Sequence, residues 1–249
     1  MRRCLTLLLL TALTAVSLDA AEDKDPSLLT LKRIYASGEF DSRGFSARWL
    51  GDGREYLRLE GSEDSAGGRD LVCYDSATGD REVLVPAAHL IPPGESSPLK
   101  IDGYALSEDR SLLLIYTNSK RVWRRNTRGD YWVLDRSSRE LRKLGGDAKP
   151  SSLMFAKFSP TGEHVAYVRE KNIYVEDLRE RRTIKLTSAD SPNIINGTFD
   201  WVYEEELSLR DGFRWSPDGK SIAYWQLDTS GVRVFSMINN TDALYPRII

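Results

Sequence analysis

The chain is poor in cysteine, in histidine and in net charge. Its 249 residues include 2 cysteines and 2 histidines, with 35 basic against 37 acidic side chains. Cys4 lies in a leader-like segment, which leaves Cys73 without an intrachain disulfide partner. His89 and His164 are too far apart in sequence for a zinc-type motif, and charges of both signs are interspersed without a basic stripe. We therefore expect no metal site, no cofactor and no bound nucleic acid, and a fold stabilised by apolar burial.

A secretory signal peptide is predicted for residues 1–21. Two arginines precede an apolar run from Leu5 to Leu18, and small residues around Ala20 offer a cleavage point. The run is shorter than the roughly 20 apolar residues that span a bilayer. We therefore expect an exported protein, periplasmic or secreted, with no membrane span after cleavage and with its folded part in residues 22–249.

Four segments of similar pattern divide the rest of the chain. Each joins a bulky apolar residue, a turn of Ser, Pro, Asp or Gly type, and a short β-rich run; they begin at Trp49, Leu106, Phe158 and Trp215. The starts are 57, 52 and 57 residues apart, and each repeat is predicted to be a meander of about four antiparallel strands. Repeats of this size are typical of propeller blades. The predicted fold class is all-β: a β-propeller with about four blades present, which form either a minimal ring or half of a larger one.

Two departures from the repeat contain the most distinctive residues. In the second repeat, the link between the middle strands spans residues 118–129 and is predicted to be an extended basic loop with Trp123 and Arg124. Before the fourth repeat, 15 extra residues include Asp200 as a helix N-cap and a predicted short helix over residues 201–209. On composition alone, both insertions are also compatible with solvated, charged surface segments.

The predicted helix contains Glu204, Glu205 and Glu206 in succession. Adjacent carboxylates repel one another, and neighbouring helix positions point about 100° apart, so this is a poor way to stabilise a helix. One interpretation is a solvent-facing acidic turn. The other is that two carboxylates converge on a cation such as a free α-ammonium group, whose three donors they would satisfy. A nearby arginine is then needed to balance the negative charge, and Arg124 is the candidate.

Several stretches of the chain form a recognisable set. They are Leu29–Phe40, Asp200–Glu206, Trp215–Gly219, Ile222–Gln226, Asp228–Val232 and Asn239–Pro246. Together they resemble the N-terminal β-propeller portion of the dipeptidyl peptidase IV branch of the prolyl oligopeptidase serine peptidase family, in particular its bacterial members. The likeness extends from about residue 28 to the last residue.

The resemblance implies an exopeptidase that releases dipeptides from free N-termini and prefers Pro or Ala as the second residue. The substrate-binding residues that it implies are Glu205 and Glu206 for the ammonium group and Arg124, or alternatively Arg125, for the carbonyl of the second residue. The supporting residues are Glu204, Trp201, Tyr203 and Trp123.

The departure from the family concerns catalysis. Family members have a C-terminal α/β-hydrolase domain with Ser in a G-x-S-x-G elbow, followed by Asp and His. This chain has no G-x-S-x-G and no histidine after His164, and it accounts for about four of the family's eight blades. We therefore expect a partial propeller that is inactive alone and binds peptide N-termini for an absent α/β-hydrolase domain, with homodimerisation through the full-length form as a further possibility. The alternative is a non-catalytic periplasmic propeller that binds a protein partner.

Overall fold

The computed structural model describes residues 27–42, 44–51, 53–189 and 191–249. It divides the chain into two units, Met1–Ser46 and Ala47–Ile249. The predicted signal peptide lies outside the described residues. The first unit contains a short helix, α1 (Leu31–Tyr35), whose N-cap Thr30 accepts a hydrogen bond from Arg33 N. No helix in the described part of the chain has the length and apolarity needed to cross a bilayer.

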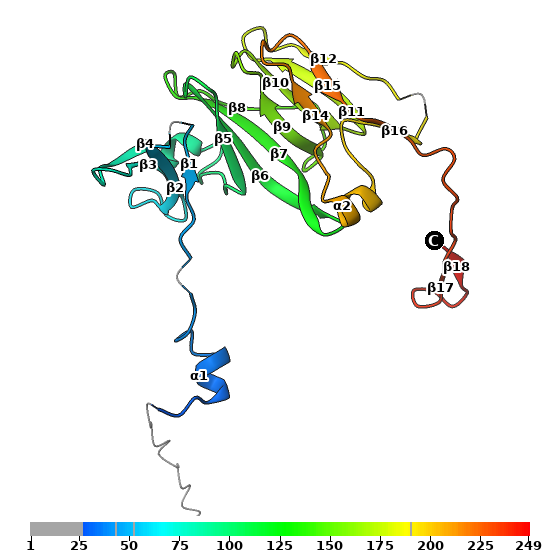
Figure 1. Cartoon of the computed structure of the whole chain (residues 1–249), viewed down its shortest axis with the longest axis horizontal. Helices are drawn as coiled ribbons and strands as arrows, with labels where there is room; N and C mark the ends of the chain where they lie inside the picture. The colour runs from blue at the N-terminus through cyan, green and yellow to red at the C-terminus, as the bar shows by residue number, and fades with distance from the viewer. Residues whose placement is uncertain (1–26, 43, 52, 190) are drawn as a thin grey trace, which may run out of the picture. The chain divides into compact units, whose positions relative to one another are not determined.

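The second unit is built from antiparallel sheets, and its first three repeats form regular meanders (Figure 1). The first consists of β1 (Arg48–Trp49), β2 (Glu55–Gly61), β3 (Arg69–Asp75) and β4 (Arg81–Val85), followed by the 3-10 helix η1 (Ala87–Leu90). The second consists of β5 (Gly103–Leu106), β6 (Leu112–Val122), β7 (Arg125–Asp135) and β8 (Leu141–Lys143). The third consists of β9 (Leu153–Phe158), β10 (His164–Arg169), β11 (Asn172–Asp177) and β12 (Thr183–Lys185). These meanders confirm the predicted blade pattern.

The fourth repeat is less regular than the other three. Its elements are β13 (Ile194–Asn196), α2 (Trp201–Leu207), β14 (Phe213–Trp215), β15 (Ile222–Tyr224) and β16 (Gln226–Asp228), followed by a hairpin of β17 (Ile238–Asn239) and β18 (Arg247–Ile248). β14 pairs with β15, whereas β13 pairs with β16, so the helix is inserted between strands that have different partners. The insertion predicted from the repeat spacing is therefore part of this blade and carries the predicted short helix.

The core between the blades depends on strands that are buried on both faces. In β10, Val165 and Tyr167 pack in one cluster with residues of the second blade, while Ala166 and Val168 pack in another with Phe213 of the fourth. Because successive side chains of a strand point to opposite faces, the four buried central residues of β10 contribute to two cores. The third blade is thereby packed against both of its neighbours.

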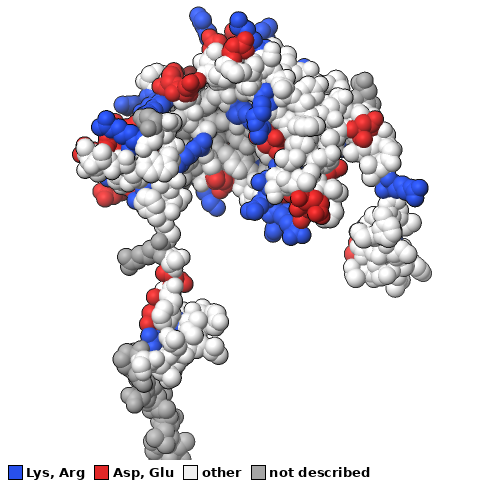
Figure 2. Space-filling view, in the orientation of Figure 1, with Lys and Arg blue, Asp and Glu red and all other residues white. Residues whose placement is uncertain are grey.

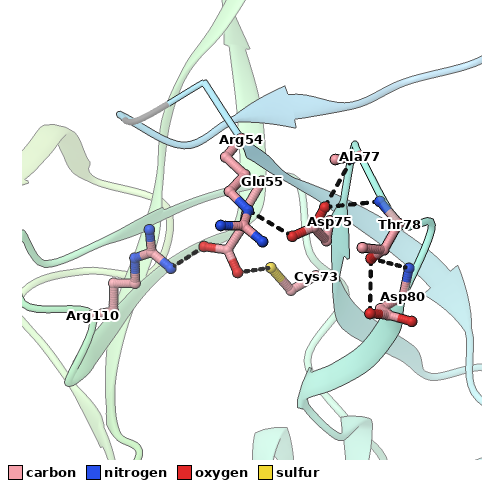
Figure 3. Close-up of polar contacts among 8 residues, drawn as sticks. All are labelled: Arg54, Glu55, Cys73, Asp75, Ala77, Thr78, Asp80 and Arg110. Atoms are coloured by element: carbon pink, nitrogen blue, oxygen red, sulfur yellow. Dashed lines mark hydrogen bonds and ion pairs between the residues drawn. The ribbon is translucent and has the colours of Figure 1, made fainter.

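A partly buried polar contact also joins the first and second blades (Figure 3). The free thiol of Cys73 lies in β3, with its Sγ 3.7 Å from Glu55 Oε1. The second Glu55 oxygen accepts a hydrogen bond of 2.6 Å from Arg110, in the turn between β5 and β6. Burial, followed by the nearby Glu55 carboxylate, raises the pKa of the Cys73 thiol, which therefore stays protonated and unreactive at neutral pH.

The third strand of each regular blade ends in an aspartate that closes the following turn. These residues are Asp75, Asp135 and Asp177, and each Oδ1 accepts backbone hydrogen bonds from the residues two and three positions later. Figure 3 shows this arrangement at Asp75. Hydrogen bonds from backbone N–H groups lower the pKa of Asp75 and Asp177; the Ser137 hydroxyl is the main cause at Asp135. The repeat thus uses one local device to set the register of its outer hairpins.

These turns predict a specific loss of stability in acid. Their carboxylate pKa values are lower in the folded state than in the unfolded chain, so the stability they contribute is present above about pH 4 and is lost as the pH falls through the folded values. We expect the triple variant Asp75→Asn, Asp135→Asn and Asp177→Asn to show a weaker pH dependence of urea unfolding between about pH 5 and pH 3. Glu63→Gln, on an exposed connection, is the control. A variant as acid-sensitive as the wild type would contradict the prediction.

Gly129 of β7 has no space for a side chain. A Cβ there would lie 2.3 Å from Tyr116 Cε2 and 2.7 Å from the carbonyl oxygen of Thr117. Gly129→Ala is therefore expected to lower the free energy of unfolding by about 1–3 kcal/mol, as overpacking does. Gly61→Ala is the matched control, because no heavy atom lies within 4 Å of its added Cβ. Equal stability of the two variants in chemical denaturation would refute this explanation.

Candidate functional site

The basic insertion of the second blade is a hairpin, so the predicted loop over residues 118–129 was wrong. β6 and β7 continue through this segment to a two-residue turn at Trp123 and Arg124, closed by pairing of Val122 with Arg125. Trp123 takes a left-handed conformation with φ of 49°, which a two-residue hairpin turn requires. Backbone pairing between β6 and β7 continues as far as this turn, with register shifts between Thr117 and Arg121.

Side-chain hydrogen bonds hold the two arms of this hairpin together. The Tyr116 hydroxyl donates to the carbonyl oxygens of Asn126 at 3.0 Å and Arg128 at 2.8 Å. Burial raises the pKa of Tyr116 to about 12, so this hydroxyl remains a donor. Asn118 donates to Asp130 at 2.8 Å across the same hairpin. These hydrogen bonds link β6 to β7 and support the turn that contains Arg124.

The glutamates lie on α2, which begins as predicted and ends two residues early. The N-cap Asp200 accepts a hydrogen bond of 3.2 Å from Tyr203 N, which satisfies a free N–H group of the first turn. Ser208 then adopts a left-handed conformation with φ of 54°, and its N–H bonds back to the Tyr203 carbonyl. This cap stops the helix at Leu207.

The structure brings the hairpin and the acidic helix together. Arg124 Nε lies 2.6 Å from Glu205 Oε1, with side chains that are 72% and 11% exposed. Figure 2 shows basic and acidic side chains next to each other where the hairpin meets α2. The expected pairing of the two insertions is therefore present, and among the described residues the contact to Glu205 is made by Arg124 rather than Arg125.

Two carboxylate oxygens at this site lack hydrogen bonds. Glu204 is 7% exposed, and its Oε1 is buried with no hydrogen-bond partner among the described residues. The same holds for Glu205 Oε1, so its close contact with Arg124 is a charge interaction without hydrogen-bond alignment. Buried acceptors without donors are costly, and a ligand with several N–H groups would satisfy them. The described residues contain no cluster of three or more His, Cys, Asp or Glu side chains suited to a metal ion.

The remaining predicted residues lie on the same two elements, the hairpin turn and α2. Glu206 is exposed on α2, and Trp123 and Trp201 are each about half exposed. Tyr203 packs its ring against Phe199 with centroids 5.3 Å apart, which anchors the buried side of the helix. The hairpin turn and α2 thus carry an exposed carboxylate, two half-exposed indoles and two largely buried carboxylates, groups of the kinds that bind a small cation with an apolar neighbour.

Comparison with known proteins identifies the family. Residues 107–248 match the family model described as the dipeptidyl peptidase IV (DPP IV) N-terminal region. The chain belongs to this family. The resemblance inferred from the motifs is thereby confirmed.

The relatives of this DPP IV N-terminal region are peptidases. The chain is 29% identical over 231 residues to human prolyl endopeptidase FAP, covering 92% of this chain and 28% of that protein. It is 33% identical over 171 residues to dipeptidyl aminopeptidase B of Saccharomyces cerevisiae, covering 67% of this chain and 20% of that protein. The crystal structure of Porphyromonas gingivalis dipeptidyl peptidase 4 matches with a TM-score of 0.71 and 26% identity, over 89% of this chain and 30% of that one. The chain thus spans less than a third of the length of these relatives.

A double-mutant cycle tests which arginine interacts with the glutamates. Arg124→Ala and Glu205→Gln are expected to show a coupling of about 0.2–1 kcal/mol in the free energy of unfolding, because the arginine is largely exposed and its charge is screened. Arg125→Ala replaces Arg124→Ala in the control cycle and is expected to show no coupling. A larger coupling for Arg125 would reverse the assignment.

Proposed function

We propose that this chain is the substrate-recognition part of an exported dipeptidyl peptidase IV-like serine exopeptidase, in which it binds the free N-terminus of the peptide. The observation that carries the proposal is the buried carboxylate oxygen of Glu205, which has a positive charge beside it and no hydrogen bond among the described residues. Membership of the DPP IV family supports the substrate class.

In this proposal Glu205 and Glu206 bind the peptide ammonium group. An ammonium group supplies three N–H donors and one positive charge, so it satisfies acceptors that neither water nor a blocked N-terminus matches as well. Arg124 presents its Nε to Glu205, which leaves its terminal N–H groups available for the carbonyl oxygen of the second residue. Glu204, which is buried on the same helix, adds negative potential, and Trp123, Trp201 and Tyr203 are the supporting residues.

We further propose that the hydrolytic step belongs to an α/β-hydrolase domain that acts together with this propeller. The 249 residues contain no G-x-S-x-G elbow, whereas the names of the relatives describe peptidases several times as long. Export to the periplasm or the medium, and assembly as a homodimer of the full-length form, complete the proposal. The recognition site fixes where a peptide begins, so cleavage at a set distance from it releases dipeptides.

Peptide binding tests the proposed function. A short peptide with a free amino group and Pro at its second position is titrated into the chain in a calorimeter, with the N-acetylated peptide as the matched ligand. We expect the free amine to bind more tightly, and Glu205→Gln or Glu206→Gln to weaken its binding about 10–100-fold, as the loss of a charge-assisted hydrogen bond does. In the full-length enzyme the same substitutions are expected to raise KM and lower kcat/KM.

Glu63→Gln is the control, because this glutamate is exposed and lies on the first blade. Equal affinity for the free and acetylated peptides, or wild-type affinity in both site variants, would contradict the proposal. If the chain binds neither peptide but binds a folded protein tightly, the result would favour the non-catalytic propeller instead.

A further inference from the structure

The segment that contains α2 is closed at its base by tight backbone contacts. It runs from the end of β13 to the start of β14, and Thr198 and Asp211 form a bridge across this neck. Gly212 N donates to the carbonyl oxygen of Gly197 at 3.0 Å. A Cβ at Gly212 would lie 2.9 Å from Gly197 C, so the two chains approach too closely for a side chain there. The direction of α2 is therefore set at this neck.

A lysine from another blade holds the neck in place. Lys157 lies in β9 of the third blade, and its Nζ is 2.6 Å from both carboxylate oxygens of Asp211. It also donates to the carbonyl oxygen of Phe213 at 3.0 Å and lies 3.8 Å from the centre of the Phe213 ring. All the N–H groups of the ammonium are thus used on the residues that follow α2.

This ion pair is more sheltered than an ordinary surface pair. The side chains of Lys157 and Asp211 are 24% and 31% exposed. Burial lowers the pKa of the Lys157 amine, and the hydrogen bond and charge of Asp211 oppose that shift. Arg214 is a second cation on Asp211, 3.0 Å from Oδ2, but its own side chain is largely exposed. Lys157 is therefore the partner that gives the carboxylate a defined geometry.

Strand β9 also supports the other half of the site. Leu153 of β9 pairs with Gly129 of β7, at the root of the hairpin that presents Arg124. The helix with Glu205 is tied to the same strand through Lys157 and Asp211. The hairpin with Arg124 and the helix with Glu205 are thus both attached to β9, at positions four residues apart along it.

We propose that Lys157 and Asp211 are positioning residues that orient α2 and thereby place Glu205 against Arg124 for the binding of a peptide N-terminus. The effect on peptide binding rests on the proposed function, whereas the effect on α2 does not. Neither residue touches the peptide in this proposal. Their contribution is to hold the geometry in which two carboxylates and one guanidinium face the same ligand.

The first experiment does not require any peptide. The Arg124→Ala and Glu205→Gln cycle is repeated in the Lys157→Met background, with chemical denaturation as the measurement. We expect the coupling between Arg124 and Glu205 to fall to less than half of its wild-type value. An unchanged coupling would overturn the proposal, because α2 would then keep its orientation without the lysine.

The matched control is Arg142→Met. Arg142 of β8 pairs with the buried Glu176 of β11, so its loss breaks an ion pair between blades that is more sheltered than that of Lys157 and Asp211 and involves no residue of α2. We expect it to lower stability while leaving the coupling between Arg124 and Glu205 intact. A similar loss of coupling in this control would mean that the effect of Lys157→Met is only general destabilisation.

The second experiment measures the affinity for the free-amine peptide well below each variant's unfolding temperature. Lys157→Met and Asp211→Asn are each expected to weaken binding about 5–20-fold, the double variant no more than either single one, and Arg142→Met not at all. Wild-type affinity in both single variants would overturn the positioning of the peptide site. If the wild type does not distinguish free from acetylated peptide, the proposed function fails, and the coupling experiment still decides whether Lys157 orients α2.

Discussion

Mutual repulsion of three adjacent carboxylates on one short helix is the constraint on which the local structure depends. Glu204 and Glu205 are largely buried, so their charges cannot be left to water alone. Arg124, which supplies the compensating charge, comes from a hairpin about 80 positions earlier in the chain. The hairpin is itself strongly basic, because Lys120 and Arg128 face each other across its strands. Like charges repel one another within each segment, and the attraction between the basic hairpin and the acidic helix offsets part of this repulsion.

Much of the architecture was predictable from sequence because its signals are local. The turn residues that recur every 52 to 57 residues mark the starts of the repeats, and Asp200 marks the start of the helix. The motif around the glutamates is also distinctive enough to indicate the family from sequence alone. These features depend on residues close together in the chain, where turn chemistry and capping act.

The sequence predicts less well where no nearby residue signals the conformation or the contact. The turn at Trp123 contains no glycine or asparagine that would indicate its positive φ, so the sequence predicts a loop where the structure has a hairpin. The helix stops at Ser208, which is not a typical left-handed cap. The sequence does not indicate that Lys157 belongs to the site, because its partner Asp211 lies 54 residues later in the chain. Strand pairing of β13 with β16 likewise depends on residues about 30 positions apart.

Gly129 has a geometric consequence for the site. The hairpin extends about 17 Å from this residue to its tip, at about 3.3 Å per residue. Over this length, a rotation of the hairpin by about 5° at its root moves the tip by about 1.5 Å. This displacement exceeds the spread of about 0.5 Å in donor–acceptor distance within which a hydrogen bond keeps good geometry. The missing side chain at Gly129 lets Tyr116 pack flat against the root. The absence of one methyl group at the root of the hairpin, about 17 Å from its tip, thus helps to fix the position of Arg124.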